Sequence, residues 1–151
     1  MKLLHVLLIL MLVVLLAGCS ALPAVDTSMS TAATTDFLPD ITGRYTSPGE
    51  VAAYIHVYQK LPDNYLTKKQ AADLGWDASS GNLWDVTDQM SIGGDRFGNR
   101  EGLLPDAGDR IWYECDVNYQ GGFRGSERLV YSNDGLIYYT SDHYSSFTRI
   151  Y

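Results

Sequence analysis

The sequence has few of the residues that crosslink small proteins or hold metal ions. Its 151 residues include only two cysteines and three histidines. Two cysteines exclude a disulfide-rich scaffold and a zinc site built from four cysteines. No segment repeats along the chain, and no long apolar run occurs beyond the N-terminus. These absences leave one compact domain with an extension in front of it.

Positive charge is also scarce. Eleven lysines and arginines stand against eighteen aspartates and glutamates, which gives a net charge of −7. This balance argues weakly against a polyanionic partner, but a local basic cleft can override the charge of the whole surface. A content of 46% hydrophobic and 19% charged residues is that of a globular protein. The length suits one domain and a short extension.

The N-terminus has the pattern of a secretory signal peptide. Lys2 precedes an almost unbroken apolar run, Leu3 to Leu16, which is shorter than the roughly 20 residues of a membrane span. The tetrapeptide Leu16-Ala17-Gly18-Cys19 resembles the lipobox of bacterial lipoproteins, in which the cysteine is lipidated and becomes the mature N-terminus. We therefore expect residues 1–18 to be a lipoprotein signal peptide and Cys19 to be the lipidation site. The alternative is an ordinary signal peptide that happens to end in a cysteine.

A linker is expected to follow the lipidated residue. Residues 20–44 are rich in Ser, Thr, Ala and Pro and have neither helical nor strand periodicity. Residues 19–44 are therefore predicted to be a lipidated end and a flexible leash with a span of roughly 25–30 Å. On this interpretation the protein is secreted across the cytoplasmic membrane and stays tethered to its outside. Cys115 is then left without a disulfide partner, and the folded domain is predicted to span residues 45–151.

Helix signals fill the first half of that domain. A capping-box pattern at residues 47–50, followed by apolar residues at helical spacing, predicts a helix that runs to Tyr58. A second cap at residues 67–70 predicts a further short helix, and a third short helix is expected over residues 82–86. Lys68 would stand at the first position of the second helix, where a cation opposes the helix dipole. Such an unfavourable position suggests that the lysine is needed there.

The hydrophobic period changes from 3.6 to 2 near Gly93. Over residues 111–119 the odd-numbered side chains are mostly apolar, whereas the even-numbered ones are Trp, Glu, Asp and Asn. Further strands are expected at residues 128–131 and 136–140, joined by a turn, and at residues 146–151. Helices first and antiparallel strands afterwards predict an α+β fold, with N-terminal helices packed on a C-terminal antiparallel sheet.

Two ionisable residues are candidates for acid–base chemistry. Glu114, one of four glutamates, lies mid-strand beside Trp112, where a rigid strand could hold a general base or simply present a solvated face. His143 lies in a polar break between two strands, where it could take part in the chemistry or be merely exposed. Arg124 and Arg128 can bind a phosphate bidentately, or can serve only solubility.

A set of short motifs spans Val51–Ile150 without a gap. They are Lys60-Leu61-Pro62-Asp63-Asn64-Tyr65, Ala72, Leu74-Gly75-Trp76, Gly81-Asn82-Leu83, Ser91-Ile92-Gly93-Gly94-Asp95, Asn99-Arg100-Glu101-Gly102, Asp116, Asn118-Tyr119, Gly122-Phe123-Arg124 and Asp142-His143-Tyr144. In this order the motifs resemble the bacterial guanyl-specific extracellular ribonucleases. The likeness covers the whole predicted domain, and its motifs are distinctive.

The resemblance implies a role for each candidate. Glu114 matches the general base and His143 the general acid. The cations around the scissile phosphate match Lys68, Arg124 and Arg128, which gives the lysine a reason for its place at a helix start. The guanine-binding loop matches Phe97, Gly98, Asn99, Arg100 and Glu101. The aromatic residues that line the nucleotide site match Phe123 and Tyr144.

These roles imply an endoribonuclease that cleaves single-stranded RNA on the 3′ side of guanosine. The base would remove the 2′-hydroxyl proton, and the acid would protonate the leaving 5′-oxygen. A 2′,3′-cyclic phosphate would form first and would then be hydrolysed to the 3′-phosphate. Backbone amides and the Glu101 carboxylate can read the guanine edge while an aromatic face stacks on the base. Because the 2′-hydroxyl is the nucleophile, we expect no metal ion or other cofactor.

Two other functions fit the same sequence. A catalytically weak or inactive module with this fold could bind RNA or a protein inhibitor, although intact Glu114 and His143 argue against it. An antibacterial toxin would use the same chemistry in another setting. We expect a monomer whose partners are RNA, the membrane through Cys19 and, as a further candidate, a small acidic protein inhibitor. Its acidity departs from the basic relatives and predicts slower association with RNA.

Overall fold

The structure, a computed structural model, describes residues 37–151. The predicted signal peptide and the predicted lipidation site at Cys19 lie outside the described residues. Between residues 37 and 151, no helix is long and apolar enough to cross a membrane.

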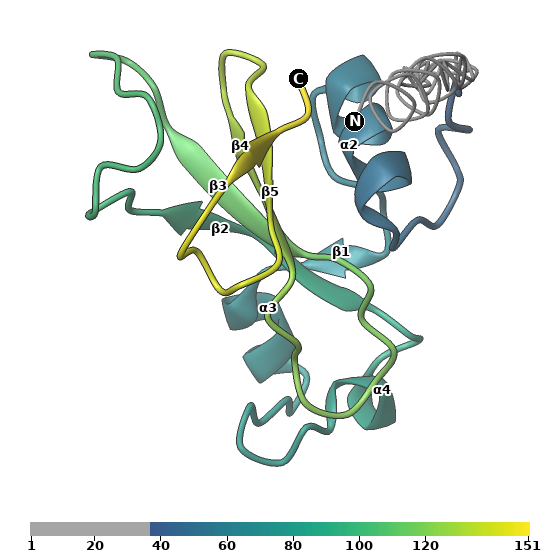
Figure 1. The fold of residues 1–151 in the computed structure, drawn as a ribbon. Helices are drawn as coiled ribbons and strands as arrows, with labels where there is room; N and C mark the ends of the chain where they lie inside the picture. The colour runs from purple at the N-terminus through teal and green to yellow at the C-terminus, as the bar shows by residue number, and fades with distance from the viewer. Residues whose placement is uncertain (1–36) are drawn as a thin grey trace, which may run out of the picture. The chain divides into compact units, whose positions relative to one another are not determined.

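A sheet of six strands forms the centre of the described domain (Figure 1). In chain order, which is also their order in the sheet, the strands are β1 (Tyr65–Leu66), β2 (Ser91–Phe97), β3 (Trp112–Asp116), β4 (Arg128–Ser132), β5 (Ile137–Thr140) and β6 (Thr148–Arg149). β1 runs parallel to β2, and all other neighbouring strands are antiparallel. The predicted α+β fold with an antiparallel sheet after the helices is therefore confirmed, with one parallel pair added.

Three helices lie within the described residues: α2 (Pro48–Tyr58), α3 (Lys68–Asp73) and α4 (Leu83–Val86). In Figure 1, α2 stands beside β4 and β5, whereas α3 stands beside β2. The apolar stripe of α2, including Val51 and Ile55, packs on Cys115 and Leu129 of the sheet. A second cluster joins α3 and α4 to β1 and β2 around the fully buried Leu83. These two clusters fix all three helices against the strands.

The two predicted capping boxes have different outcomes. At α3, the Thr67 side chain accepts the backbone N–H of Gln70, and the Gln70 side chain accepts the N–H of Thr67. At α2, Ser47 is the N-cap but caps no backbone N–H, because its hydroxyl donates to the Glu50 carboxylate at 2.5 Å. The capping box is therefore confirmed at α3 and wrong at α2. Pro48, which has no N–H to satisfy, starts α2 instead.

Both faces of the sheet are covered. Along β3, Cys115 faces the core beneath α2, whereas Trp112 packs in a cluster on the other face. Glu114 and Asp116 lie on that second face and are only 7% and 2% exposed. The interpretation of this face as a solvated surface is therefore wrong. The cover comes from loops that follow the strands and contribute Leu104, Tyr144 and Phe147, together with Phe97, Leu136 and Tyr138.

The folded domain begins before residue 45. Pro39 is fully buried, and the backbone carbonyls of Pro39 and Ile41 accept hydrogen bonds from the hydroxyls of Tyr58 and Tyr54 at 2.7 and 2.8 Å. Buried tyrosine hydroxyls need acceptors, and residues 37–44 supply them. Residues 37–44, which the sequence analysis assigns to the linker, therefore complete the packing of α2.

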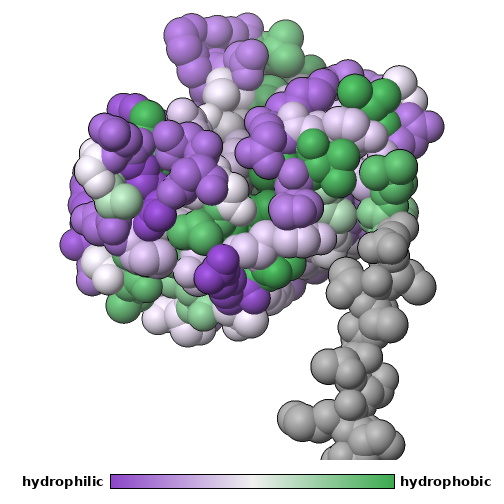
Figure 2. All heavy atoms as spheres, turned by 90° about the horizontal axis from the view of Figure 1, so that it is seen from above, coloured by the Kyte–Doolittle hydropathy of each residue, from purple (hydrophilic) through white to green (hydrophobic). Residues whose placement is uncertain are grey.

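The outer side of the same segment is apolar. Phe37, Leu38 and Ile41 are exposed, and Figure 2 shows apolar surface where the described chain begins. Scattered apolar side chains are normal on a globular surface. The stabilising contribution of residues 37–44 is therefore expected to come from their buried carbonyls and Pro39 rather than from these exposed groups.

We predict that a chain of residues 45–151 is less stable than one of residues 37–151. The shorter chain lacks the acceptors of two tyrosine hydroxyls, and each lost hydrogen bond costs about 1 kcal/mol. Urea denaturation should show a lower free energy of unfolding for the shorter chain. As a control, Tyr58→Phe should destabilise the longer chain more than the shorter one. Equal midpoints for the two chains would mean that residues 37–44 do not support the fold.

Candidate active site

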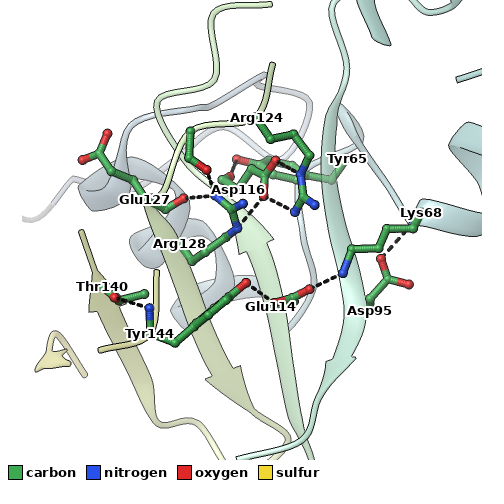
Figure 3. Close-up of polar contacts among 11 residues, drawn as sticks. Tyr65, Lys68, Asp95, Glu114, Asp116, Arg124, Glu127, Arg128, Thr140 and Tyr144 are labelled. Carbon is green, nitrogen blue, oxygen red and sulfur yellow. Dashed lines mark hydrogen bonds and ion pairs between the residues drawn. The ribbon is translucent and has the colours of Figure 1, made fainter. Parts of the chain in front are cut away.

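A buried carboxylate on the central strand β3 is the centre of the site. Glu114 Oε1 accepts a hydrogen bond from Lys68 Nζ at 2.5 Å, and Oε2 accepts one from the Tyr144 hydroxyl. The lysine comes from the start of α3 and the tyrosine from the loop after β5, so three distant segments meet at one carboxylate (Figure 3). These contacts confine the Glu114 carboxylate to one position.

The surroundings of Glu114 keep it ionised. Burial alone would raise the pKa of its carboxyl, but the hydrogen bonds from Lys68 and Tyr144 and the positive charges of Lys68 and Arg124 lower it more. The resulting pKa lies below the usual value for a glutamate. Burial and the bond to Glu114 also raise the pKa of Tyr144, so the phenol stays protonated as a donor. At neutral pH the Glu114 carboxylate can therefore accept a proton rather than donate one.

Lys68 is held at the first position of α3 by two local devices. The capping box of Thr67 and Gln70 starts the helix at this residue, and the backbone N–H of Lys68 donates to Asp95 Oδ2 at 2.9 Å. A β-bulge at Gly94, where φ is 91°, brings Asp95 opposite Glu114 in the sheet. The Asp95 carboxylate thus faces the positive end of the helix dipole and offsets the unfavourable lysine.

A second buried carboxylate anchors two arginines. The Asp116 carboxylate accepts two hydrogen bonds from Arg124, one from Nη2 at 2.6 Å and one from Nε at 2.7 Å. It also forms an ion pair with Arg128, whose Nε lies 2.8 Å from Asp116 Oδ1. Arg128 also donates to the carbonyls of Gly125 and Glu127. The Nη1 nitrogen of Arg124 donates to no protein group within residues 37–151. Both guanidinium groups are therefore fixed in orientation. Arg124, the more exposed of the two arginines, has its Nη1 group available as a further donor.

An open hollow of about 850 Å³ adjoins the site at Tyr144, whose hydroxyl contacts Glu114. Its walls include the loop over residues 97–101 and the segment over residues 143–145. The loop is closed by Asn99, whose side chain donates to the carbonyl of Leu104 at 2.9 Å and accepts its N–H at 3.0 Å. The predicted guanine-binding residues thus share one cavity with His143 and Tyr144: Phe97, Gly98, Asn99, Arg100 and Glu101.

Tyr144 connects the hollow to the carboxylate cluster. Its hydroxyl contacts Glu114, and its ring centroid lies 4.8 Å from that of His143. His143 itself is exposed and lies in the turn after β5. The candidate base contacts the hydroxyl of Tyr144, and the candidate acid lies beside its ring.

The structure does not gather every predicted residue. Phe123 is 70% exposed and does not line the hollow. The predicted base and cations do not line it either, and they adjoin it through the contact of Glu114 with Tyr144: Glu114, Lys68, Arg124 and Arg128. Three residues that sequence reasoning did not assign to the site also shape it, namely Asp95, Asp116 and Trp112. The alternation along β3 does place Asp116 and Trp112 on the face of Glu114. No local signal points to Asp95, because its partner Lys68 lies 27 residues away in the sequence.

A buried ionised carboxylate, a nearby histidine and three fixed cations beside an open hollow are the groups that metal-free phosphodiester cleavage requires. The fold and the site therefore define a candidate nuclease. The chain belongs to the ribonuclease family, whose model matches residues 49–151. The family predicted from the motifs is thereby confirmed.

Individual relatives agree with this family. The chain is 61% identical over 100 residues to the "Ribonuclease" of Bacillus intermedius, and the match covers 66% of this chain and 62% of the relative. It is 60% identical over 100 residues to the "Ribonuclease" of Heyndrickxia coagulans, covering 66% of this chain and 92% of the relative. It is 44% identical over 52 residues to "Guanyl-specific ribonuclease St" of Saccharopolyspora erythraea, covering 34% and 52% of the two chains. The matched stretch thus spans less than two thirds of the Bacillus relative.

Acidic, cysteine and histidine side chains, the usual ligands of metal ions, are spread over the described domain. Within residues 37–151, no three or more of them lie close enough together to hold a metal ion. In this part of the chain, the cations that contact the buried carboxylates Glu114 and Asp116 are Lys68, Arg124 and Arg128.

We predict that Lys68→Ala raises the pKa of Glu114. The substitution removes the hydrogen bond and the charge that oppose burial, while the burial itself remains. The pKa can be measured by NMR titration of labelled glutamate carboxyl carbons, of which the chain has four. Lys69→Ala is the matched control, because Lys69 is exposed and pairs with Asp73 instead. A Glu114 pKa that is equal in both variants would contradict the described contact.

Proposed function

We propose that this protein is an endoribonuclease that cleaves single-stranded RNA on the 3′ side of guanosine. The observation that carries the proposal is the buried, ionised Glu114, one tyrosine side chain away from His143. Membership of the ribonuclease family and the likeness to a relative named a guanyl-specific ribonuclease support it.

In the proposed reaction, Glu114 accepts the proton of the ribose 2′-hydroxyl. The 2′-oxygen attacks phosphorus while the 5′-oxygen of the next nucleotide leaves with a proton from His143. The product is a 2′,3′-cyclic phosphate. In a second step the histidine takes a proton from water, and the protonated glutamate returns its own proton to the 2′-oxygen. A 3′-phosphate remains, and both residues regain their starting states.

The cations would stabilise the charge that accumulates on the non-bridging phosphate oxygens. Lys68 touches Glu114, and Arg124 has an Nη1 donor that no protein group within residues 37–151 accepts. Arg128 is more deeply buried and would act through its charge and through the position of Asp116. Because these groups are held before substrate arrives, little reorganisation is needed during the reaction.

The loop over residues 97–101 would bind guanine. Guanine offers an acceptor at O6 and donors at N1 and N2, so backbone amides and the Glu101 carboxylate can satisfy it. Phe97 and Tyr144 form an aromatic pair with ring centroids 5.1 Å apart at the edge of the hollow. An unpaired base can stack on such side chains, which favours single-stranded RNA. Phe123, exposed outside the hollow, would contact a neighbouring nucleotide.

We predict that Glu114→Gln and His143→Ala each lower turnover by about 10²–10⁴. The test is digestion of a defined oligoribonucleotide with its cut sites mapped, where wild-type protein should cut after guanosine. Glu50→Gln and His56→Ala are matched controls, because Glu50 lies at the start of α2 and His56 stacks on Tyr151. Full activity in either site variant would refute its role. Binding of RNA without cleavage by the wild type would favour an inactive module.

We also propose that the protein is secreted and held at the outside of the membrane by a lipid on Cys19. The support is the sequence Leu16-Ala17-Gly18-Cys19 after an apolar run. We further propose that the domain acts as a monomer, and that any protein inhibitor would be small and acidic because the site presents cations.

Cys19→Ser should release the protein from the membrane. Without an acylated cysteine the chain has no lipid to anchor it, so it should move to the soluble fraction when cells are fractionated. Ser20→Ala, one residue further on, is the control and should stay with the membrane. Retention of the Cys19→Ser protein would contradict the lipid anchor and leave the activity proposal untouched.

A further inference from the structure

The turn that carries His143 has an unusual backbone. His143 and Tyr144 follow one another with φ values of 55° and 73°, both in the left-handed region that residues with a side chain rarely adopt. Two consecutive left-handed residues without a glycine persist only where the surroundings hold them. Both side chains belong to the proposed site, so whatever holds this turn also sets the geometry of the site.

One side of the turn is held by the end of strand β5. Thr140 Oγ1 accepts the backbone N–H of Tyr144 at 3.0 Å and donates to Asp142 Oδ1 at 2.8 Å (Figure 3 draws the first of these bonds). Thr140 is only 1% exposed, and its backbone pairs with Arg128 on β4. The hydroxyl is therefore a fixed point from which the turn is positioned.

The other side of the turn is held by Asp142. Its Oδ1 accepts the backbone N–H of Ser146 at 2.9 Å, and its Oδ2 accepts the Ser146 hydroxyl at 2.6 Å. The hydrogen bonds from Ser146 and Thr140 lower the pKa of Asp142 to about 2, so the carboxylate stays charged throughout the neutral range. Thr140, Asp142 and Ser146 thus form a chain of hydrogen bonds that spans His143 and Tyr144.

We infer that Thr140 and Asp142 are positioning residues for catalysis, which hold His143 in the hollow and the Tyr144 hydroxyl on Glu114. This inference rests on the proposed function. Neither residue lines the hollow, so each acts through the backbone of the turn and not on the substrate. Released from these bonds, the two residues would relax toward ordinary φ values. The imidazole and the phenol would then leave their places together.

Two substrates with different leaving groups can distinguish a misplaced catalytic acid from a general loss of structure. A guanosine 3′-phosphate ester with a ribonucleoside as leaving group needs a proton from the acid. The 4-nitrophenyl ester of guanosine 3′-phosphate needs none, because nitrophenolate is a stable anion. A misplaced acid therefore slows the first substrate more than the second, whereas partial unfolding slows both equally.

The decisive pair of variants is Thr140→Val and Thr140→Ser in the full chain. Valine has the shape of threonine but no hydroxyl, whereas serine keeps the hydroxyl. We expect Thr140→Val to lower kcat about 10–100-fold for the substrate with the ribonucleoside leaving group, since small misplacements of catalytic groups have effects of this size. The loss for the nitrophenyl ester should be at least fivefold smaller, as a rough margin above assay error for a general-acid effect. Thr140→Ser should restore both rates to within about threefold of wild type.

His143→Ala serves as the reference, and circular dichroism checks that each variant is folded. If His143→Ala slows both substrates equally, the proposed acid role fails, whatever the threonine variants do. If His143→Ala is selective but Thr140→Val slows both substrates equally or neither, the positioning role is overturned. Should Thr140→Val not fold, Asp142→Asn replaces it, with the same selectivity expected and the same equal loss overturning the inference.

Discussion

The contact of Glu114 with Lys68 and Tyr144 is the interaction on which the rest of the site depends. A carboxylate that is only 7% exposed would normally take up a proton, because burial disfavours its charge. The hydrogen bonds from Lys68 and Tyr144 and the positive charges of Lys68 and Arg124 reverse that tendency and lower the pKa of Glu114. They can do so only if the start of α3 and the loop after β5 are both fixed relative to β3. The cap of α3, the bulge at Gly94 and the left-handed turn at His143 and Tyr144 serve this requirement.

Asp116, two residues further along β3, is likewise a buried carboxylate that is paired with cations. It is buried with two arginines, and a buried ion pair of this kind is held by geometry and further hydrogen bonds rather than by strong net attraction. Its benefit here is orientation, because the guanidinium groups cannot swing into solvent. A chain with a net charge of −7 therefore gathers three cations, Lys68, Arg124 and Arg128, around the buried carboxylates of this site.

The sequence predicts where helices and strands lie better than it predicts which segments pack against them. The box at Thr67 and Gln70 predicts the start of α3, and alternation predicts which side chains share a face of β3. Alternation does not show what covers a face of the sheet. The burial of Glu114 follows from the loops that pack over its face, and their positions cannot be read from the alternation. β1 has only two residues and no period to detect. Asp95 and Thr140 act through residues distant in sequence or through backbone atoms, which composition and spacing do not reveal.

Cys115 has a consequence for the environment in which the domain can survive. It is 1% exposed and points toward α2, away from its neighbour Glu114. Burial raises the pKa of this thiol far above its usual value, and a protonated, inaccessible thiol is a poor nucleophile. Outside the reducing cytoplasm, an unshielded single cysteine would invite crosslinking between molecules. The helix that completes the core thus also protects the domain from covalent aggregation in oxidising surroundings.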